Sequence, residues 1–134
     1  FFGKIRRGFT RIDVTDTPDL FPILAAGAPL YYGAEFLGTE RLKYKESDRV
    51  ISLVGELKKF GIDSIVEDDS VMVYKSDIHA PVEKISSHND HRIAMALSVL
   101  LSVTGGELSG SECVSKSYPG FFDVLNEIKD EEDI

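Results

Sequence analysis

The sequence predicts an α/β domain built from two similar strand–helix–strand–helix units. Short runs rich in β-branched and aromatic residues alternate with longer apolar stretches of helical period. Glycines and prolines separate these segments. Motifs of the first half return in the same order in the second half. A chain of 134 residues is long enough for one compact core. We therefore expect a single domain over residues 1–134.

Composition excludes several classes of protein. Hydrophobic residues make up 43% of the chain and charged residues 28%, as in soluble globular proteins. The net charge of −8 argues against a nucleic-acid surface, which needs a broad basic field. No apolar run is long enough to cross a bilayer, so no membrane association is expected. A single cysteine, Cys113, rules out an intrachain disulfide and fits a reducing, cytoplasmic location.

The first unit is expected to cover about residues 9–77. Alternation over residues 9–14 predicts a strand. Thr17 and Pro18 suit the N-cap and first position of a helix of about three turns. Residues 31–44, punctuated by glycines, are expected to form one or two strands.

A second helix is expected to begin near Ser47 and to end at Gly61. Its apolar face repeats at helical spacing and consists of Val50, Ile51, Leu53, Val54, Leu57 and Phe60. Residues 63–76 carry two β-rich runs around an acidic turn and predict a hairpin.

The second unit is expected to cover about residues 78–129. A strand at 81–86 leads to a third helix, capped by Asn89 or Asp90 and ended by the glycine pair 105–106. The pattern then predicts a strand in 106–115 and a fourth helix in 116–130. The last residues, 130–134, are expected to be a solvated acidic tail that overlaps the end of this helix.

The two units align with an offset of about 72 residues. The alignment places Asp19 opposite Arg92 and Lys45 opposite Lys116. It favours an internal duplication, although two similar α/β units could also arise independently.

Polar residues gather where the four expected helices begin. They are Asp19 at the first helix, Lys45, Glu46 and Arg49 at the second, His91 and Arg92 at the third, and Lys116 at the fourth. A helix N-terminus carries unpaired N–H groups and a partial positive charge, so basic residues there are unfavourable for the helix itself. Their repeated presence indicates an anionic ligand such as a phosphate or a carboxylate.

Each of these residues also has a simpler interpretation. Lys45, Glu46 and Arg49 could form a surface ion-pair set at helical spacing. Asp19 could favour its helix dipole, and His91 could be a structural histidine. Arg92 precedes an apolar helix and needs a partner in either case.

Four motifs together resemble one family. "DTPDL", "KESDR", "DHRIAMA" and "KSYPGFF" are similar to the C-terminal part of the 5-enolpyruvylshikimate-3-phosphate (EPSP) synthases over residues 9–125. The resemblance implies transfer of the enolpyruvyl group of phosphoenolpyruvate to the 5-hydroxyl of shikimate 3-phosphate, with release of phosphate. This reaction belongs to the shikimate pathway of aromatic amino-acid and chorismate synthesis, and the resemblance implies no metal or cofactor.

The resemblance also implies an architecture. The family fold is an inside-out α/β barrel with two domains of three βαβαββ units each, whose helix N-termini point into the cleft between domains. This chain would supply two units of one domain and about half of the active site. It lacks an initiator methionine, and we expect it to require a missing N-terminal part for turnover.

Roles follow from the positions that match the family motifs. Asp19 matches the proposed base at the 5-hydroxyl, Glu46 a carboxylate near the methylene carbon of phosphoenolpyruvate, and His91 a histidine beside it. The matching cations at the substrate hydroxyl, phosphate and carboxylate groups are Lys45, Arg49, Arg92 and Lys116. Arg41 receives no firm role, since some members of the family have an amide there.

Two other functions remain open. The chain could belong to an enolpyruvyl transferase acting on a UDP-sugar, which shares the fold. It could also be a non-catalytic anion-binding module that keeps the motifs.

Overall fold

The computed structural model describes residues 10–132 of the chain. The helices are α1 (Phe21–Gly27), α2 (Arg49–Lys59), α3 (His91–Thr104) and α4 (Phe121–Glu132). The strands are β1 (Thr10–Asp13), β2 (Ala34–Leu37), β3 (Ser64–Val66), β4 (Ser70–Val73), β5 (Ile85–Ser86) and β6 (Leu108–Ser109). Short 3-10 helices lie between them: η2 (Pro18–Leu20), η3 (Ala28–Leu30), η4 (Glu40–Tyr44) and η5 (Ser111–Lys116).

The strands form two sheets, so the mixed α/β fold is confirmed. One sheet has the order β1-β2-β4-β3, in which β1 and β2 are parallel and the other neighbours antiparallel. The β3–β4 pair is the predicted hairpin, closed by a hydrogen bond of 2.8 Å from Glu67 N to Ser70 O. The other sheet is the parallel pair β5–β6. In each parallel pair one helix, α1 or α3, connects the two strands, as in a βαβ unit.

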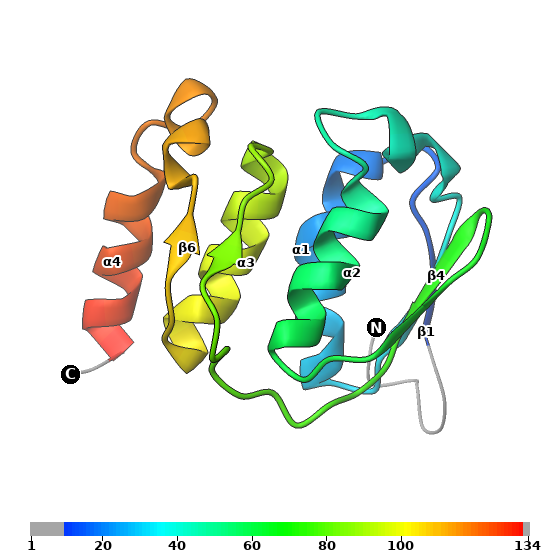
Figure 1. The fold of residues 1–134 in the computed structure, drawn as a ribbon, viewed down its shortest axis with the longest axis horizontal. Coiled ribbons are helices and arrows are strands. Elements are labelled where there is room, and N and C mark those ends of the chain that lie inside the picture. The colour runs from blue at the N-terminus through cyan, green and yellow to red at the C-terminus, as the bar shows by residue number, and fades with distance from the viewer. Residues whose placement is uncertain (1–9, 133–134) are drawn as a thin grey trace.

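Helices α1, α2 and α3 lie between the larger sheet on one side and α4 on the other (Figure 1). Their N-terminal ends all face the same end of the molecule, which is the upper end in Figure 1. The residues that begin α1, α2 and α3 therefore meet at this end. This common orientation places the predicted polar residues near one another.

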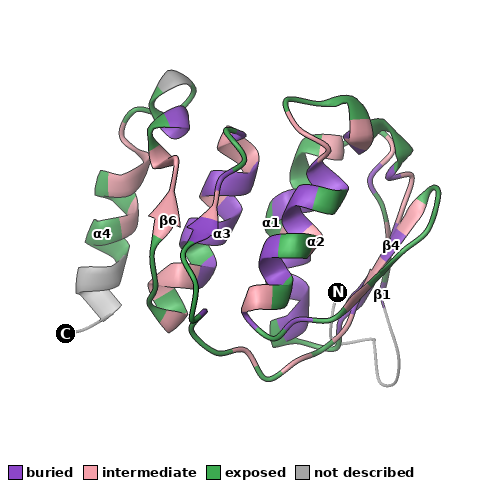
Figure 2. Cartoon of the chain, viewed as in Figure 1, coloured by how far each residue is buried: buried purple, intermediate pink, exposed green. Residues whose placement is uncertain are grey.

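The main core lies between the larger sheet and the inner faces of α1, α2 and α3 (Figure 2). Phe21 of α1 meets Phe36 of β2 edge to face, with ring centroids 5.2 Å apart. Ile93 and Leu97 of α3 belong to the same buried cluster, so both halves of the chain contribute to it. Cys113 lies in a smaller cluster with Ala94 and Val114.

Several predicted boundaries were wrong. The first helix is two α-helical turns flanked by η2 and η3, and Pro29 has no N–H for the bond that would continue α1 beyond Ala28. Thr17 precedes η2 but makes no side-chain capping bond. Helix α2 begins at Arg49 and is capped by Asp48, two residues later than expected. The ends of α3 are confirmed, with Asp90 as the N-cap and Gly105 at a φ of 80°.

Two segments expected to be extended contain a strand and a 3-10 helix: β2 confirms one strand in residues 31–44, and β6 confirms a short one in residues 106–115. Residues 40–44 form η4, because Asp69 of the hairpin turn accepts hydrogen bonds from Gly38 N (2.9 Å) and Glu40 N (3.0 Å). In the segment 106–115 only β6 is extended, and Gly110, in the left-handed region, starts η5.

The other differences concern the termini of elements. The strand expected at 81–86 shortens to β5. Helix α4 begins at Phe121, five residues later than predicted, and continues through the first residues of the expected acidic tail to Glu132. Residues 1–9 and 133–134, which include the start of the first predicted strand and the end of the tail, lie outside the described part.

Gly38 provides a test of the turn after β2. Its φ is 76°, and an added Cβ would overlap Thr15 Oγ1. Gly38→Ala is therefore expected to lower the free energy of unfolding by about 1–3 kcal/mol in urea denaturation. Gly55→Ala is the control: in mid-α2 with open space around it, it should raise stability by about 0.5–1 kcal/mol. Equal effects of the two substitutions would contradict this account.

Candidate active site

Arg49 lies at the centre of a group of three carboxylates. It is the first residue of α2, and its side chain is 1% exposed. Its Nε donates to Asp90 Oδ2 at 2.9 Å, its Nη1 to Asp19 Oδ1 at 2.8 Å, and its Nη2 to Glu46 Oε2 at 2.6 Å. Glu46–Arg49 is thus an ion pair at i,i+3, but the buried guanidinium shows that it is not an ordinary surface pair.

Asp90 joins this group to the start of α3. Its side chain is 0% exposed and accepts a hydrogen bond from Ser47 Oγ at 2.7 Å. Its Oδ1 caps α3 by accepting from Arg92 N at 3.0 Å, and it also receives Arg49 Nη2 at 3.3 Å. Burial alone would raise the pKa of the Asp90 carboxyl, but the hydrogen bonds from Arg49 and Ser47 outweigh burial and lower this pKa below its ordinary value.

This lowered pKa predicts a loss of stability in acid. Because the folded-state pKa lies below the ordinary 3.8, the contribution of Asp90 is present above pH 3.8 and is lost as the pH falls through the folded-state value. Urea denaturation at pH values from about 6 to about 2 should show this fall in the free energy of unfolding. The Asp90→Asn variant, which cannot ionise, should show a flatter profile, and an unchanged profile would contradict the assignment.

Asp19 and Arg92 form the open side of the site. Asp19 lies in η2, and its Oδ2 is 3.6 Å from Arg92 Nη2. Asp19 and Glu46 are 52% and 51% exposed, so each remains accessible while it contacts Arg49. Within residues 10–132, Nε of Arg92 is buried and lacks a hydrogen-bond partner. The Arg92 side chain as a whole is 40% exposed, so its guanidinium can donate to an anionic or hydroxylic ligand.

The other predicted residues lie around this group. Lys45 is exposed just ahead of α2 and makes no hydrogen bond or ion pair with the described residues. His91 is the first residue of α3 and is half-buried. Lys116 is the last residue of η5, which packs against α3, and its side chain lies outside the described part. Arg41 is an exposed residue of η4.

An apolar groove between α1 and α3 starts at the open side. Asp19 and Arg92 line a cavity of about 200 Å³ together with Leu20, Met95 and Phe121. A second cavity, of about 260 Å³, continues along the same helices and shares Ile23 and Val99 with the first. We call these two cavities the α1–α3 groove. Its two charged residues, Asp19 and Arg92, lie at the end next to the site.

Two further observations concern the described part of the chain. It contains no group of three or more His, Cys, Asp and Glu side chains arranged to hold a metal ion. None of its helices has both the length and the apolar character that a membrane span requires.

Comparison with known proteins assigns the family. The family model for EPSP synthase (3-phosphoshikimate 1-carboxyvinyltransferase) matches residues 5–125. The chain belongs to the EPSP synthase family. A 3-phosphoshikimate 1-carboxyvinyltransferase of Clostridium kluyveri is 40% identical over 125 residues, which are 91% of this chain and 29% of that protein. One from Sulfurisphaera tokodaii is 40% identical over 115 residues, 85% of this chain and 28% of that protein.

A solved EPSP synthase supports the same assignment. The enzyme from Acinetobacter baumannii superposes with a TM-score of 0.71 at 31% identity, over 85% of this chain and 27% of that one. The chain therefore spans less than a third of the length of these EPSP synthase relatives.

The structure brings together four of the residues that the EPSP synthase motifs predict: Asp19, Glu46, Arg49 and Arg92. Sequence reasoning missed Ser47 as a partner and saw Asp90 only as a possible cap. The contact between Arg49 and Asp90 joins residues 41 positions apart, so no local pattern reports it.

Proposed function

We propose that this chain is part of an EPSP synthase that transfers the enolpyruvyl group of phosphoenolpyruvate to the 5-hydroxyl of shikimate 3-phosphate and releases phosphate. The observation that carries the proposal is the convergence of Asp19, Glu46, Arg49 and Arg92 from three helix starts in a chain of this family. Such an enzyme would act in the shikimate pathway, in the cytoplasm, on small-molecule substrates.

Two accessible carboxylates divide the proton transfers in this proposal. Asp19 removes the proton of the attacking 5-hydroxyl, and Glu46 serves the methylene carbon of phosphoenolpyruvate, which gains a proton on addition and loses one on elimination. Asp19 contacts two guanidinium groups and Glu46 one, so their electrostatic settings differ. Different settings let two carboxylates take different roles in one reaction. His91, at the first position of α3, is the third proposed catalytic group.

Cations at the helix starts hold the anionic groups of the substrates. Lys45 is exposed and makes no ion pair with described residues, and the Arg92 side chain is 40% exposed, so both can donate to an anionic group. Lys116 is proposed as a further phosphate- or carboxylate-binding cation. Arg49 is directed at protein carboxylates, so direct contact with substrate requires Asp19 or Glu46 to release one of its N–H groups.

The repeat architecture forms part of the proposal. The order β1-α1-β2-α2-β3-β4 is that of a βαβαββ unit, proposed to cover residues 9–77. The order β5-α3-β6-α4 repeats its first four elements and is proposed as a second unit, residues 78–129. Residues 1–134 would then be one partial domain of the inside-out α/β barrel, ending in the acidic residues 130–134.

The rest of the enzyme is proposed to be required for activity. The chain spans 29% of its Clostridium kluyveri relative. The α1–α3 groove, which starts at the site, exposes apolar side chains such as Ile23 and Val103. Exposed apolar patches of this kind mark contact surfaces. We propose that the remaining part of the EPSP synthase covers this groove and completes the site.

A chimeric enzyme tests the function. This chain replaces the matching segment of the Clostridium kluyveri relative, and phosphate release is followed with phosphoenolpyruvate and shikimate 3-phosphate. Saturable release by the chimera, but not by the 134-residue chain alone, is expected. Turnover only with a UDP-sugar acceptor would favour the other transferase. Absence of turnover, with the unmodified relative active under the same conditions, would count against the proposal and favour a non-catalytic module.

A further inference from the structure

Glu56 is a buried carboxylate in the middle of α2 that the proposed chemistry does not use. It lies two turns along the helix from Arg49, and its side chain is 6% exposed. A carboxylate so far removed from water needs hydrogen-bond donors. The residues that donate these hydrogen bonds indicate the role of Glu56.

These donors come largely from the segment that leads into α3. Glu56 Oε1 accepts from Ser86 N at 2.7 Å, and Oε2 lies 3.0 Å from His88 Nε2. Lys59 Nζ donates to Oε1 at 3.0 Å from the same helix. Burial alone would raise the pKa of Glu56, but the hydrogen bonds from Ser86, His88 and Lys59 outweigh it and lower this pKa.

The segment 86–90 is a strained turn that needs such support. His88 and Asn89 have φ values of 53° and 55°, a conformation that residues with a Cβ adopt rarely. The turn is internally bonded, from Asn89 N to Ser87 Oγ at 3.1 Å and from Asp90 N to Ser87 O at 3.0 Å. Strained backbone of this kind persists where surrounding contacts fix it.

Helix α2 thus holds this turn at two points. Arg49 binds Asp90 at the end of the turn, and Glu56 binds Ser86 and His88 at its start. Glu56 lies seven positions after Arg49, which is about two helical turns, so both residues are on one face of α2. The next residues after the turn are His91 and Arg92.

We propose that Glu56 is a positioning residue: by fixing the 86–90 turn against α2, it sets the place of His91 and Arg92 in the active site. The inference rests on the proposed function for its effect on catalysis. Its structural part, the fixing of the turn, can be measured without turnover. Small displacements of substrate-holding groups weaken their contacts without any change in their chemistry.

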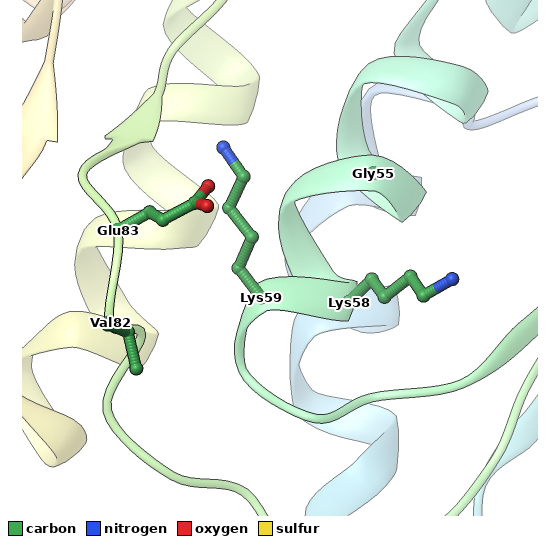
Figure 3. A pocket seen from close by; sticks show the side chains of 5 residues that line it. All are labelled: Gly55, Lys58, Lys59, Val82 and Glu83. Carbon is green, nitrogen blue, oxygen red and sulfur yellow. The ribbon is translucent and has the colours of Figure 1, made fainter.

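Lys59 provides a matched control. It pairs with Glu56 but contacts neither Ser86 nor His88 in the described bonds. Its side chain lines a pocket of about 410 Å³ with Lys58 and Glu83, on the side of α2 that faces residues 82–83 (Figure 3). Lys59→Ala therefore removes one partner of Glu56 and leaves its bonds to the turn in place.

Amide hydrogen exchange on the 134-residue chain tests the structural part. Glu56→Ala should speed exchange about tenfold or more at residues 86–92 and leave β1 and β2 unchanged. Lys59→Ala should change exchange in neither region. Glu56→Gln keeps an oxygen for Ser86 N, so its exchange rate at residues 86–92 should lie between those of the parent and Glu56→Ala. If Glu56→Ala does not fold, His88→Ala replaces it, since that side chain is partly exposed. Unchanged exchange at 86–92, or equal acceleration everywhere, would overturn the proposal.

Kinetics of the chimera test the functional part. Glu56→Ala should raise the KM for phosphoenolpyruvate about tenfold with a smaller change in kcat, because the substrate-holding Arg92 is displaced while Asp19 and Glu46, the two proton-transferring carboxylates, lie outside the turn and are kept. The KM of Glu56→Gln should be closer to that of the parent chimera, and the KM of Lys59→Ala should equal it. A fall in kcat alone would overturn the positioning role. An inactive parent chimera would defeat the proposed function, and the exchange result would then decide the role of Glu56 by itself.

Discussion

Replacing Arg49 by alanine is expected to lower the free energy of unfolding by about 3–5 kcal/mol, the range for removal of one partner from a buried ion pair. The substitution leaves Asp90 ionised at 0% exposure, with Ser47 Oγ and Arg92 N as its remaining donors among residues 10–132. It also removes the cation that Asp19 and Glu46 share. Urea denaturation followed by circular dichroism at neutral pH measures the loss.

A surface pair provides the control for this measurement. Arg11 is 77% exposed and pairs with Glu35 at 2.9 Å. Arg11→Ala should cost less than about 1 kcal/mol. The double variant Arg49→Met with Asp90→Leu should be more stable than Arg49→Ala, because no buried charge remains unpaired. If Arg49→Ala cost no more than Arg11→Ala, the buried pair would not have the stabilising role assigned to it.

Asp19→Asn in the chimeric enzyme is expected to reduce kcat by about 10²–10⁴, the range for loss of a general acid or base. The amide keeps the size of the carboxylate and can still accept a bond from Arg49 or Arg92, but it cannot remove the hydroxyl proton. Glu46→Gln is expected to act similarly on the step at the methylene carbon. Steady-state phosphate release measures both.

Asp16→Asn is the matched control for Asp19→Asn. Asp16 is exposed three residues earlier and makes no bond to the arginines of the site in the described structure. The kcat of the Asp16→Asn variant should equal that of the parent chimera. Because Asp19 is half-exposed, Asp19→Asn should change the free energy of unfolding by about 1 kcal/mol or less. Full activity in Asp19→Asn would remove it from the proposed mechanism.

Elements with local signals could be predicted from the sequence. Asp90 and Gly105 mark the two ends of α3, and the acidic turn at 67–69 lies inside the β3–β4 hairpin. Each of these signals lies within a few residues of the feature it controls. Residues 40–44 were misassigned because Asp69, which holds the start of their turn, lies 29 residues from Glu40.

The site was predictable residue by residue, but its internal connections were not. Polar residues at helix starts indicated Asp19, Glu46, Arg49 and Arg92, and the structure joins them. The sequence predicted that the two arginines of this group bind an anionic ligand. For Arg49 the structure supplies three protein carboxylates, and the buried one, Asp90, comes from the other half of the chain.

The Arg49–Asp90 pair also affects how cooperatively the two halves of the chain unfold. It joins the start of α2, in the first half of the chain, to the start of α3, in the second half. Separating the halves would expose the main core and break this pair at once, since Ile93 and Leu97 belong to the same core as Phe36. We therefore expect the halves to unfold in one transition. A ligand held at the helix starts would then stabilise both halves together, because it binds only where they meet.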